Sequence, residues 1–238
     1  MIRGTRNALA FLSRLATPAS TENGKADLAD AVPFYPLVGV ILGGIAALPT
    51  FFVPSLAGWL YPLILAWLTR GLHWDGLADL ADACGSNATG DKFWEIIKDS
   101  RIGAFGVMAL VFGIIGQILA AKSCIESGAI YALILAPACG RAMIIALARF
   151  TTPHHTSTLA ALIHPGAQSP ITLLVLILTL IATIPFLGFS SSCIFLALAF
   201  ISLAIITRIA SRHGGANGDF YGTVVITTEL CVLIAACL

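Results

Sequence analysis

Charged residues are scarce in this chain. Lysine, arginine, aspartate and glutamate make up only 11% of its 238 residues, whereas hydrophobic residues make up 58%. A water-soluble domain has about 25% charged residues, so this chain lacks the polar side chains needed to cover a water-facing surface. The mean hydropathy of +0.94 agrees with this. The composition excludes a soluble globular domain and predicts an integral membrane protein.

Other patterns are also missing. The net charge is only +1 without a basic block, so nucleic acid is not expected as a partner. No Walker loop is present, so nucleotide hydrolysis is not indicated. The six cysteines lack the spacing of metal ligands or of a disulfide framework. We interpret them as small apolar residues of a membrane protein: Cys84, Cys124, Cys139, Cys193, Cys231 and Cys237.

Long apolar segments fill most of the chain. A straight transmembrane helix needs about 20 apolar residues, and seven segments approach or reach that length. The predicted fold class is all-α: a polytopic transmembrane helical bundle of about seven spans, forming a single integral membrane domain over residues 1–238. The segments are 35–56, 57–72, 103–121, 128–149, 170–189, 192–208 and 222–238.

The N-terminal segment, residues 1–34, is predicted to lie at the membrane interface. Arginines are interleaved with apolar residues over 1–16, unlike in a signal peptide. On a helix, Arg3 and Arg6 fall on one side, and Leu9 and Leu12 on the other. This pattern is typical of an amphipathic interfacial helix, although an ordinary packed helix would show it too.

Basic residues predict the orientation. With the N-terminus in the cytoplasm, the predicted outer loops hold a single basic residue, Lys122. The polar segments 73–101, 150–169 and 209–221 then share the cytoplasmic side. We therefore expect a multi-pass protein of the cell inner membrane whose active site faces the cytoplasm, and membrane lipid as a partner.

Acidic residues concentrate in the predicted cytoplasmic segment 73–101, which holds six of the twelve. Asp75, Asp79 and Asp82 share one helical face at i, i+4 and i+7. Their neighbours are apolar, so the second span is expected to continue through Asp82. Three carboxylates on one face repel one another, and hard oxygen ligands suit Mg²⁺ or Mn²⁺. The alternative is a solvated acidic face outside the membrane.

Four further places carry candidate residues. Asp99 forms an i, i+4 pair with Glu95, which would also suit a plain amphipathic surface helix. Arg101 opens the sequence R-I-G-A-F-G, where glycines allow backbone to approach an anion while the guanidinium pairs with it. Arg141 lies within a span and needs an anionic partner. Asp219 precedes the last span in G-G-A-N-G-D-F-Y-G, and Glu229 lies inside that span.

Carboxylates that hold a divalent metal, together with arginines at a membrane face, suit transfer of a phosphoryl-type group from a diphosphate donor. The metal bridges phosphate oxygens, and arginine takes up the developing charge.

The motifs HWDGLADLADACG, DSRIGAFGVMAL and GGANGDFYG, followed by Glu229, resemble the cobalamin synthase family, whose members are adenosylcobinamide-GDP ribazoletransferases. SRLATP and PFYPLVGVILGG fit the same family, so the resemblance covers nearly the whole chain. Asn217 departs from the family, where threonine is expected, and Ala16 replaces an expected proline.

The resemblance implies a reaction in the last steps of cobalamin (vitamin B12) biosynthesis. Alpha-ribazole or its 5′-phosphate attacks the diphosphate of adenosylcobinamide-GDP, GMP leaves, and adenosylcobalamin or its phosphate forms with Mg²⁺ as cofactor. A homo-oligomer is left open.

Taken with the resemblance, the candidates divide into three sets. The expected metal ligands are Asp75, Asp79 and Asp82. The expected catalytic residues are Asp75, Asp79, Asp82, Asp99 and Asp219. The expected substrate-binding residues are Arg101, Gly103, Arg141, His73 and Glu229.

Two other functions fit parts of the sequence. The D-G-x-x-A-D run is similar to the signature of CDP-alcohol phosphotransferases, but the arginine after the alanine and the second acidic half are missing. A secondary transporter would also place carboxylates within helices. No inverted repeat is detectable, however, and the charges gather at one face.

Overall fold

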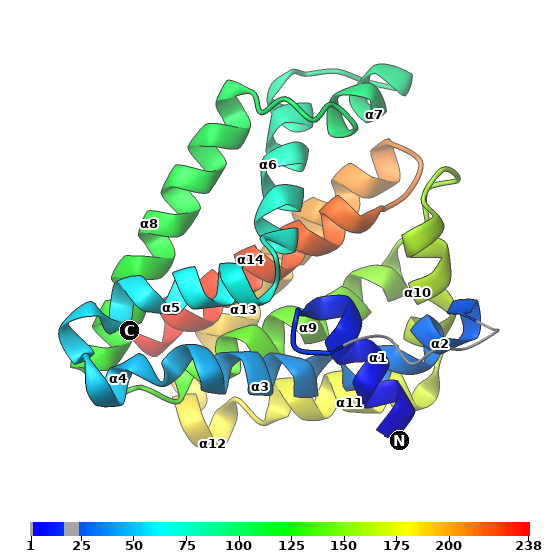
Figure 1. Ribbon diagram of the computed structural model, residues 1–238. Coiled ribbons are helices and arrows are strands. Elements are labelled where there is room, and N and C mark those ends of the chain that lie inside the picture. Colours follow the sequence, from blue (N-terminus) through cyan, green and yellow to red (C-terminus); the bar gives the residue numbers. More distant parts are fainter. Residues whose placement is uncertain (1, 17–23) are drawn as a thin grey trace.

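The computed structural model describes residues 2–16 and 24–238 (Figure 1), and their regular structure is helical. Within these residues the one β-type contact is an isolated bridge between Pro153 and Ala216. The elements are α1 (Ile2–Leu12), α2 (Gly24–Ala31), η1 (Val32–Phe34), α3 (Tyr35–Ala47), α4 (Pro49–Phe52), α5 (Pro54–Leu68), α6 (Leu72–Gly85), α7 (Asp91–Ile97), α8 (Ala104–Glu126), α9 (Ala132–Phe150), α10 (Thr158–Gln168), α11 (Pro170–Ile181), α12 (Ile184–Leu187), α13 (Phe189–Arg212) and α14 (Gly218–Ala236).

The helices confirm the predicted fold class of a polytopic helical membrane protein. Six segments are long and apolar enough to cross a bilayer, and the shorter apolar helix α5 supplies the seventh predicted span. The six are Leu28–Phe52, Ala104–Glu126, Ala132–Phe150, Pro170–Leu187, Phe189–Arg212 and Gly218–Ala236.

The prediction that the second span continues as one helix through Asp82 is wrong. α5 ends at Leu68, and the next helix begins at Leu72. Between them Arg70 and Gly71 both have a positive φ, of 59° and 72°, which interrupts the helix and changes the direction of the chain. Glycine adopts this conformation readily, whereas arginine does so at an energetic cost. The acidic residues therefore lie on a separate helix, α6, that leaves α5 at an angle (Figure 1).

Helix α8 runs along both α5 and α6 and defines two ends of the molecule. At its beginning, the backbone N–H of Gly103 donates to Asp82 of α6 at 2.7 Å. Near its far end, Lys122 packs so closely on α5 that a Cβ on Gly58 would come within 2.8 Å of the lysine Cβ. The acidic helix thus lies at one end of α8, and Lys122 at the other.

The N-terminal helix α1 ends at Leu12 rather than near residue 16, and it packs against α2 and α3. Residues 17–23 of the predicted interfacial segment lie outside the described residues. On a helix, Asn7 and Ser13 fall on the polar side together with Arg3 and Arg6, which an interfacial helix would turn toward water. Their exposed fractions are nevertheless only 7% and 0%. The helix is therefore packed against the protein over more of its surface than the amphipathic pattern indicates.

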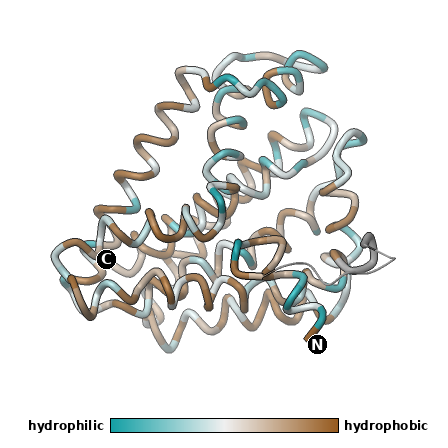
Figure 2. Tube along the Cα trace, in the orientation of Figure 1, coloured by the Kyte–Doolittle hydropathy of each residue, from teal (hydrophilic) through white to brown (hydrophobic). Residues whose placement is uncertain are grey.

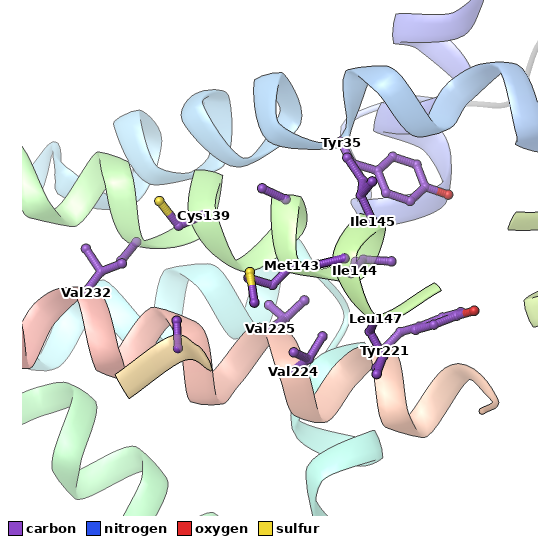
Figure 3. Close-up of a cluster of buried hydrophobic side chains, with 14 of the residues drawn as sticks. Tyr35, Cys139, Met143, Ile144, Ile145, Leu147, Tyr221, Val224, Val225 and Val232 are labelled. Carbon is purple, nitrogen blue, oxygen red and sulfur yellow. The ribbon is translucent and has the colours of Figure 1, made fainter. Parts of the chain in front are cut away.

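The core centres on α9, which lies between α3 and α14 (Figure 3). Gly43 of α3 allows the close approach, because a Cβ there would lie 2.8 Å from the Cα of Ile134. Small residues at such contacts are characteristic of membrane helices, which gain little from hydrophobic burial and associate by tight packing instead. Ile145, Val225 and other apolar side chains fill the space between the three helices.

A buried ion pair joins α9 to α14. Arg141 and Glu229 are 1% and 2% exposed, and the guanidinium Nη1 donates to Glu229 Oε1. The other oxygen, Oε2, accepts from Gln117 Nε2 of α8 at 2.9 Å. Each charge therefore has its partner inside the bundle, as it must where water is excluded.

Replacing Glu229 by glutamine should destabilise the protein by about 3–5 kcal/mol, because the charge of Arg141 would stay buried without its partner. The double variant R141M/E229Q should recover part of this loss. Thermal unfolding in detergent measures both. The matched control is Glu126→Gln, which removes an exposed carboxylate 3.7 Å from Lys122 and should leave the transition unchanged. Equal stability of E229Q and the wild type would contradict a structural role for the pair.

Candidate active site

Three predicted cytoplasmic loops meet at the end of the molecule that carries α6 and α7. The indole of Trp94 stacks on His154 with ring centroids 3.8 Å apart, and its Nε1 donates to the carbonyl of His213 at 3.0 Å. Phe93 stacks on His213 at 3.6 Å. The backbone N–H of His154 donates to Ala216 O at 2.9 Å. The structure thus brings the segments 73–101, 150–169 and 209–221 together, and hydrophilic residues gather around α7 in Figure 2.

One pocket at this end has carboxylates on one wall and an arginine at its rim. It has a volume of about 440 Å³ and lies between α6 and the connection from α7 to α8. Asp75 and Asp79 come from α6, one helical turn apart, while Arg70 comes from the left-handed turn before α6, and Ser100 and Ile102 from the connection. We call it the acidic pocket.

The carboxylates of Asp75 and Asp79 lack partners of opposite charge. Neither accepts a hydrogen bond from, or pairs with, any side chain in the part of the chain that the structure describes. Burial, together with the nearby charges of Asp219, Asp75 and Asp82, raises the pKa of Asp79 to about 7. The pocket is therefore short of positive charge and would gain most from a bound cation.

Asp219 joins this group from α14. α6 and α14 cross so closely that a Cβ on Gly76 would lie 2.8 Å from the Cα of Asp219. Thr223 fixes the crossing, because its hydroxyl donates to Gly76 O at 3.1 Å and to Asp219 O at 2.8 Å. Asp219 therefore lies directly beside the acidic face of α6.

Asn217, where the family pattern leads us to expect threonine, orients Asp219. Its Oδ1 caps α14 by accepting from the backbone N–H groups of Asp219 and Phe220, at 3.2 and 3.4 Å. Its Nδ2 donates to Asp219 Oδ2 at 2.7 Å. An amide can accept and donate in this way at once, so asparagine caps the helix and also holds the carboxylate.

Asp82 has a different environment from that predicted. Its two carboxylate oxygens accept the backbone N–H groups of Gly103 and Gly106, at 2.7 and 2.8 Å, at the beginning of α8. A Cβ at either glycine would overlap this carboxylate. R-I-G-A-F-G does bring backbone to an anion, but the anion is Asp82, whose charge also suits a helix N-terminus.

This arrangement bears on two predicted roles. Asp82 binds α8, so the geometry does not favour it as a metal ligand alongside Asp75 and Asp79. The backbone N–H of Gly103 donates to Asp82, which gives this glycine a structural contact in addition to the predicted binding of substrate.

Asp99 and Arg101 pair with each other beside the acidic pocket. Arg101 Nη2 lies 2.7 Å from Asp99 Oδ2, and its Nε 3.0 Å from Oδ1. This hydrogen-bonded guanidinium lowers the pKa of Asp99 to about 2. Both residues, together with Asp82 and Gly103, line a second pocket of about 440 Å³, which shares Ile102 with the acidic pocket.

Three predicted substrate-binding residues lie elsewhere. Arg141 and Glu229 are buried against each other, and neither lines the acidic pocket. His73 is 4% exposed and faces α14, where a Cβ on Gly222 would lie 3.1 Å from the His73 Cα. Arg141 and Glu229 therefore join α9 to α14, and the backbone of His73 packs against α14.

Arg70 is the pocket residue that the sequence did not single out. Its Nη2 donates to Phe11 O at 3.0 Å at the C-terminal end of α1, which holds the side chain at the rim. The backbone N–H of Arg14 donates to Leu68 O at 2.9 Å, so α1 is tied to the same corner. The only local signal was Gly71, a single glycine within an otherwise helical pattern, which is a weak sign of a helix end.

The acidic pocket can bind a divalent metal only if ligands other than protein side chains complete its coordination. Within the described residues, no three aspartate, glutamate, histidine or cysteine side chains are close enough to hold a metal between them. Mg²⁺, however, is usually bound by one or two carboxylates, with waters and substrate phosphates completing its octahedron. Asp75 and Asp79 suit that kind of site.

The sequence of this chain is similar to those of one family of known proteins. Residues 4–237 match the family model described as cobalamin-5-phosphate synthase. Curated proteins named adenosylcobinamide-GDP ribazoletransferase are similar over nearly their whole length. The one from Nitratidesulfovibrio vulgaris strain DP4 is 42% identical over 237 residues, which cover 96% of this chain and 95% of the relative. The one from Klebsiella pneumoniae strain 342 is 32% identical over 249 residues, 99% of each. No solved structure matches.

Gly106→Ala should destabilise the junction of α6 and α8, because the added methyl would overlap the Asp82 carboxylate that binds there. We expect a loss of about 1–3 kcal/mol in unfolding free energy. Gly44→Ala is the control, since a Cβ at that helical glycine would meet no atom within 4 Å. Unfolding in detergent compares the two variants. The contact would be unimportant if both were equally stable.

Proposed function

The chain belongs to the cobalamin-5-phosphate synthase family, and from this premise we propose that it is an adenosylcobinamide-GDP ribazoletransferase whose reaction takes place in the acidic pocket. Membership confirms the resemblance predicted from the motifs and makes the protein a transferase. In the proposed reaction a hydroxyl of alpha-ribazole, or of its 5′-phosphate, attacks the cobinamide-linked phosphorus of the diphosphate. GMP is the leaving group.

One observation carries the proposal: two unpaired carboxylates and an arginine line a single pocket. A diphosphate donor needs both kinds of group, because a cation neutralises its oxygens and guanidinium groups take up charge as the leaving group departs. The carboxylates of Asp75 and Asp79 have no positive partner among the described residues, and a metal ion bound together with the diphosphate would supply that positive charge.

We propose Mg²⁺ as the cofactor, held by Asp75 and Asp79 with Asp219 beside them. When bound, it would screen the diphosphate and polarise the phosphorus under attack. Asp219 would be kept in place by Asn217. The proton released by the acceptor hydroxyl would pass to a carboxylate of this group.

The arginines would bind the donor. Arg70 has Nε and Nη1 free of described partners, because the recorded hydrogen bonds of its guanidinium use Nη2. Arg101 is exposed and pairs only with Asp99 among the described residues, so its guanidinium can exchange this carboxylate for a phosphate. Arg70 lines the acidic pocket and Arg101 lines the neighbouring one. Both would therefore be available to a large donor that enters there.

We further propose that the pocket faces the cytoplasm from the inner membrane. The basic residues of the described loops gather on the side of the acidic pocket, and only Lys122 lies in a predicted loop on the other.

The test of the function is to incubate purified protein with adenosylcobinamide-GDP, alpha-ribazole and Mg²⁺ and to measure GMP. Release of GMP that depends on alpha-ribazole supports the proposal. A parallel reaction with a CDP-alcohol donor tests whether the protein is instead a CDP-alcohol phosphotransferase. Release of CMP from this donor without release of GMP from adenosylcobinamide-GDP would overturn the proposal. Uptake driven by an ion gradient in liposomes would instead indicate a transporter.

Asp75→Asn and Asp79→Asn should each lower turnover by about 100-fold or more while the protein stays folded in detergent, because the shape of the side chain is kept and its charge lost. Binding of Mn²⁺ in the presence of the donor, measured by electron paramagnetic resonance, should weaken in parallel. Glu95→Gln is the control: this exposed carboxylate pairs with Lys92 outside the pocket. Unchanged turnover in both aspartate variants would refute the site.

Arg70→Ala should raise the KM for the donor about 10-fold to 100-fold, because one charge-assisted contact to phosphate is lost. Arg70→Lys should recover only part of this, since lysine keeps the charge but lacks the bidentate fork. Steady-state kinetics with each substrate varied in turn separates an effect on the donor from one on alpha-ribazole. Arg212→Ala, at the same end but lining another pocket, should leave both KM values unchanged.

A further inference from the structure

Two free thiols meet where α8 and α14 end. The Sγ atoms of Cys124 and Cys237 are 3.5 Å apart, although 113 positions separate them in the sequence. Cys124 lies in the last turn of α8 and is fully buried, whereas Cys237 directly follows α14 and is exposed. The sequence indicated only that cysteines are small apolar residues, because the spacing of these two carries no disulfide signal.

The two thiols lie at the opposite end of the bundle from the acidic pocket. The first turn of α8 contacts Asp82 and its last turn contains Cys124. Asp219 lies in the first turn of α14, and Cys237 directly follows its last residue. With the acidic pocket in the cytoplasm, as proposed above, the thiol pair faces the outer compartment. Disulfides persist in such compartments, whereas thiols of the cytoplasm are kept reduced.

We propose that Cys124 and Cys237 form an intramolecular disulfide, and this inference rests on the proposed orientation. The bonded distance of about 2.05 Å requires the sulfurs to move about 1.5 Å closer, which is within the reach of side-chain rotation. Cys237 Sγ also lies 3.1 Å from Leu233 O and 3.6 Å from Ala120 O, so it already sits in the cleft between the two helices.

The exposures of the two thiols determine the order of events. A disulfide-bearing oxidant of the outer compartment reaches only Cys237, whose thiolate attacks one oxidant sulfur, forms a mixed disulfide and expels the other as a thiol. Cys124 then loses its proton, attacks the Cys237 sulfur and expels the second oxidant thiol. Two protein thiols are oxidised to one disulfide, and the oxidant disulfide is reduced to two thiols.

The bond would join the helices that flank α6. α8 and α14 both pack against α6: the backbone at the beginning of α8 binds Asp82 of α6, and Asp219 of α14 packs against Gly76 of α6. A crosslink that closes so long a loop removes much of the freedom of the unfolded chain. It would therefore hold the far ends of the two helices together without contacting the pocket.

Cys193 provides the matched control. It is exposed near the beginning of α13, and α13 ends at Arg212 beside the cytoplasmic loops, so Cys193 belongs to the same outer side. Within the described residues it has no sulfur neighbour. It should therefore remain a free thiol that an impermeant maleimide labels from outside intact cells.

Differential alkylation tests the proposal. The full-length protein is denatured without reductant and treated with a light maleimide, then reduced and treated with a heavy one, and the peptides are identified by mass spectrometry. We expect the heavy label on Cys124 and Cys237 and the light label on the other four of the six cysteines. In Cys237→Ser, Cys124 should change to the light label.

Three results would overturn the inference. The first is light label on both cysteines of the wild type while Cys193 is labelled from outside, which leaves the orientation correct and the disulfide absent. The second is heavy label on Cys124 in Cys237→Ser, which would mean a bond to another molecule. The third is labelling of Cys193 only from the cytoplasm, which removes the premise. Transferase activity, measured separately, reports on the proposed function and not on the bond.

Discussion

The cost of a charge without a partner in apolar surroundings determines how this chain is arranged. Arg141 and Glu229 satisfy each other inside the bundle, and Gln117 takes the remaining carboxylate oxygen. Asp82 satisfies the first N–H groups of α8, which have no partner within their own helix. These contacts fix which helices neighbour one another: α9 on α14, and α6 on α8. Apolar side chains, which lipid accommodates as readily as protein does, could not select these neighbours alone.

Close helix packing follows from the same constraint. A hydrogen bond between an Asp82 oxygen and the backbone of α8 requires that nothing project from the helix at that point, so Gly103 and Gly106 stand there. The crossing of α6 and α14 likewise depends on Gly76, against which Asp219 is placed. Gly76, Gly103 and Gly106 therefore have a structural explanation, because at each of them the backbone closely approaches a carboxylate or another helix.

The sequence predicted the membrane class, the approximate spans and the acidic helix, because each depends on local composition or on helical periodicity. It could not predict the break at Arg70 and Gly71, since an arginine in the left-handed region has no strong local signal. Nor could it assign partners. Arg141, Glu229 and Asp82 were recognised as charges that need an explanation, but which charge meets which depends on contacts between residues far apart in the chain.

The contrast between satisfied and unsatisfied charges is what distinguishes the acidic pocket from the rest of the protein. Asp82 and Glu229 contribute to stability because their charges are already paired. Asp75 and Asp79 share a helix with Asp82 but lack such partners among the described residues, and burial together with the neighbouring carboxylates raises the pKa of Asp79. A group of this kind destabilises the empty protein and would be stabilised by the proposed cation and diphosphate. The hydrogen bonds of Asp82, Asn217 and Arg70 hold the neighbouring segments in place, so the charge of the pocket would remain available for the proposed ligand.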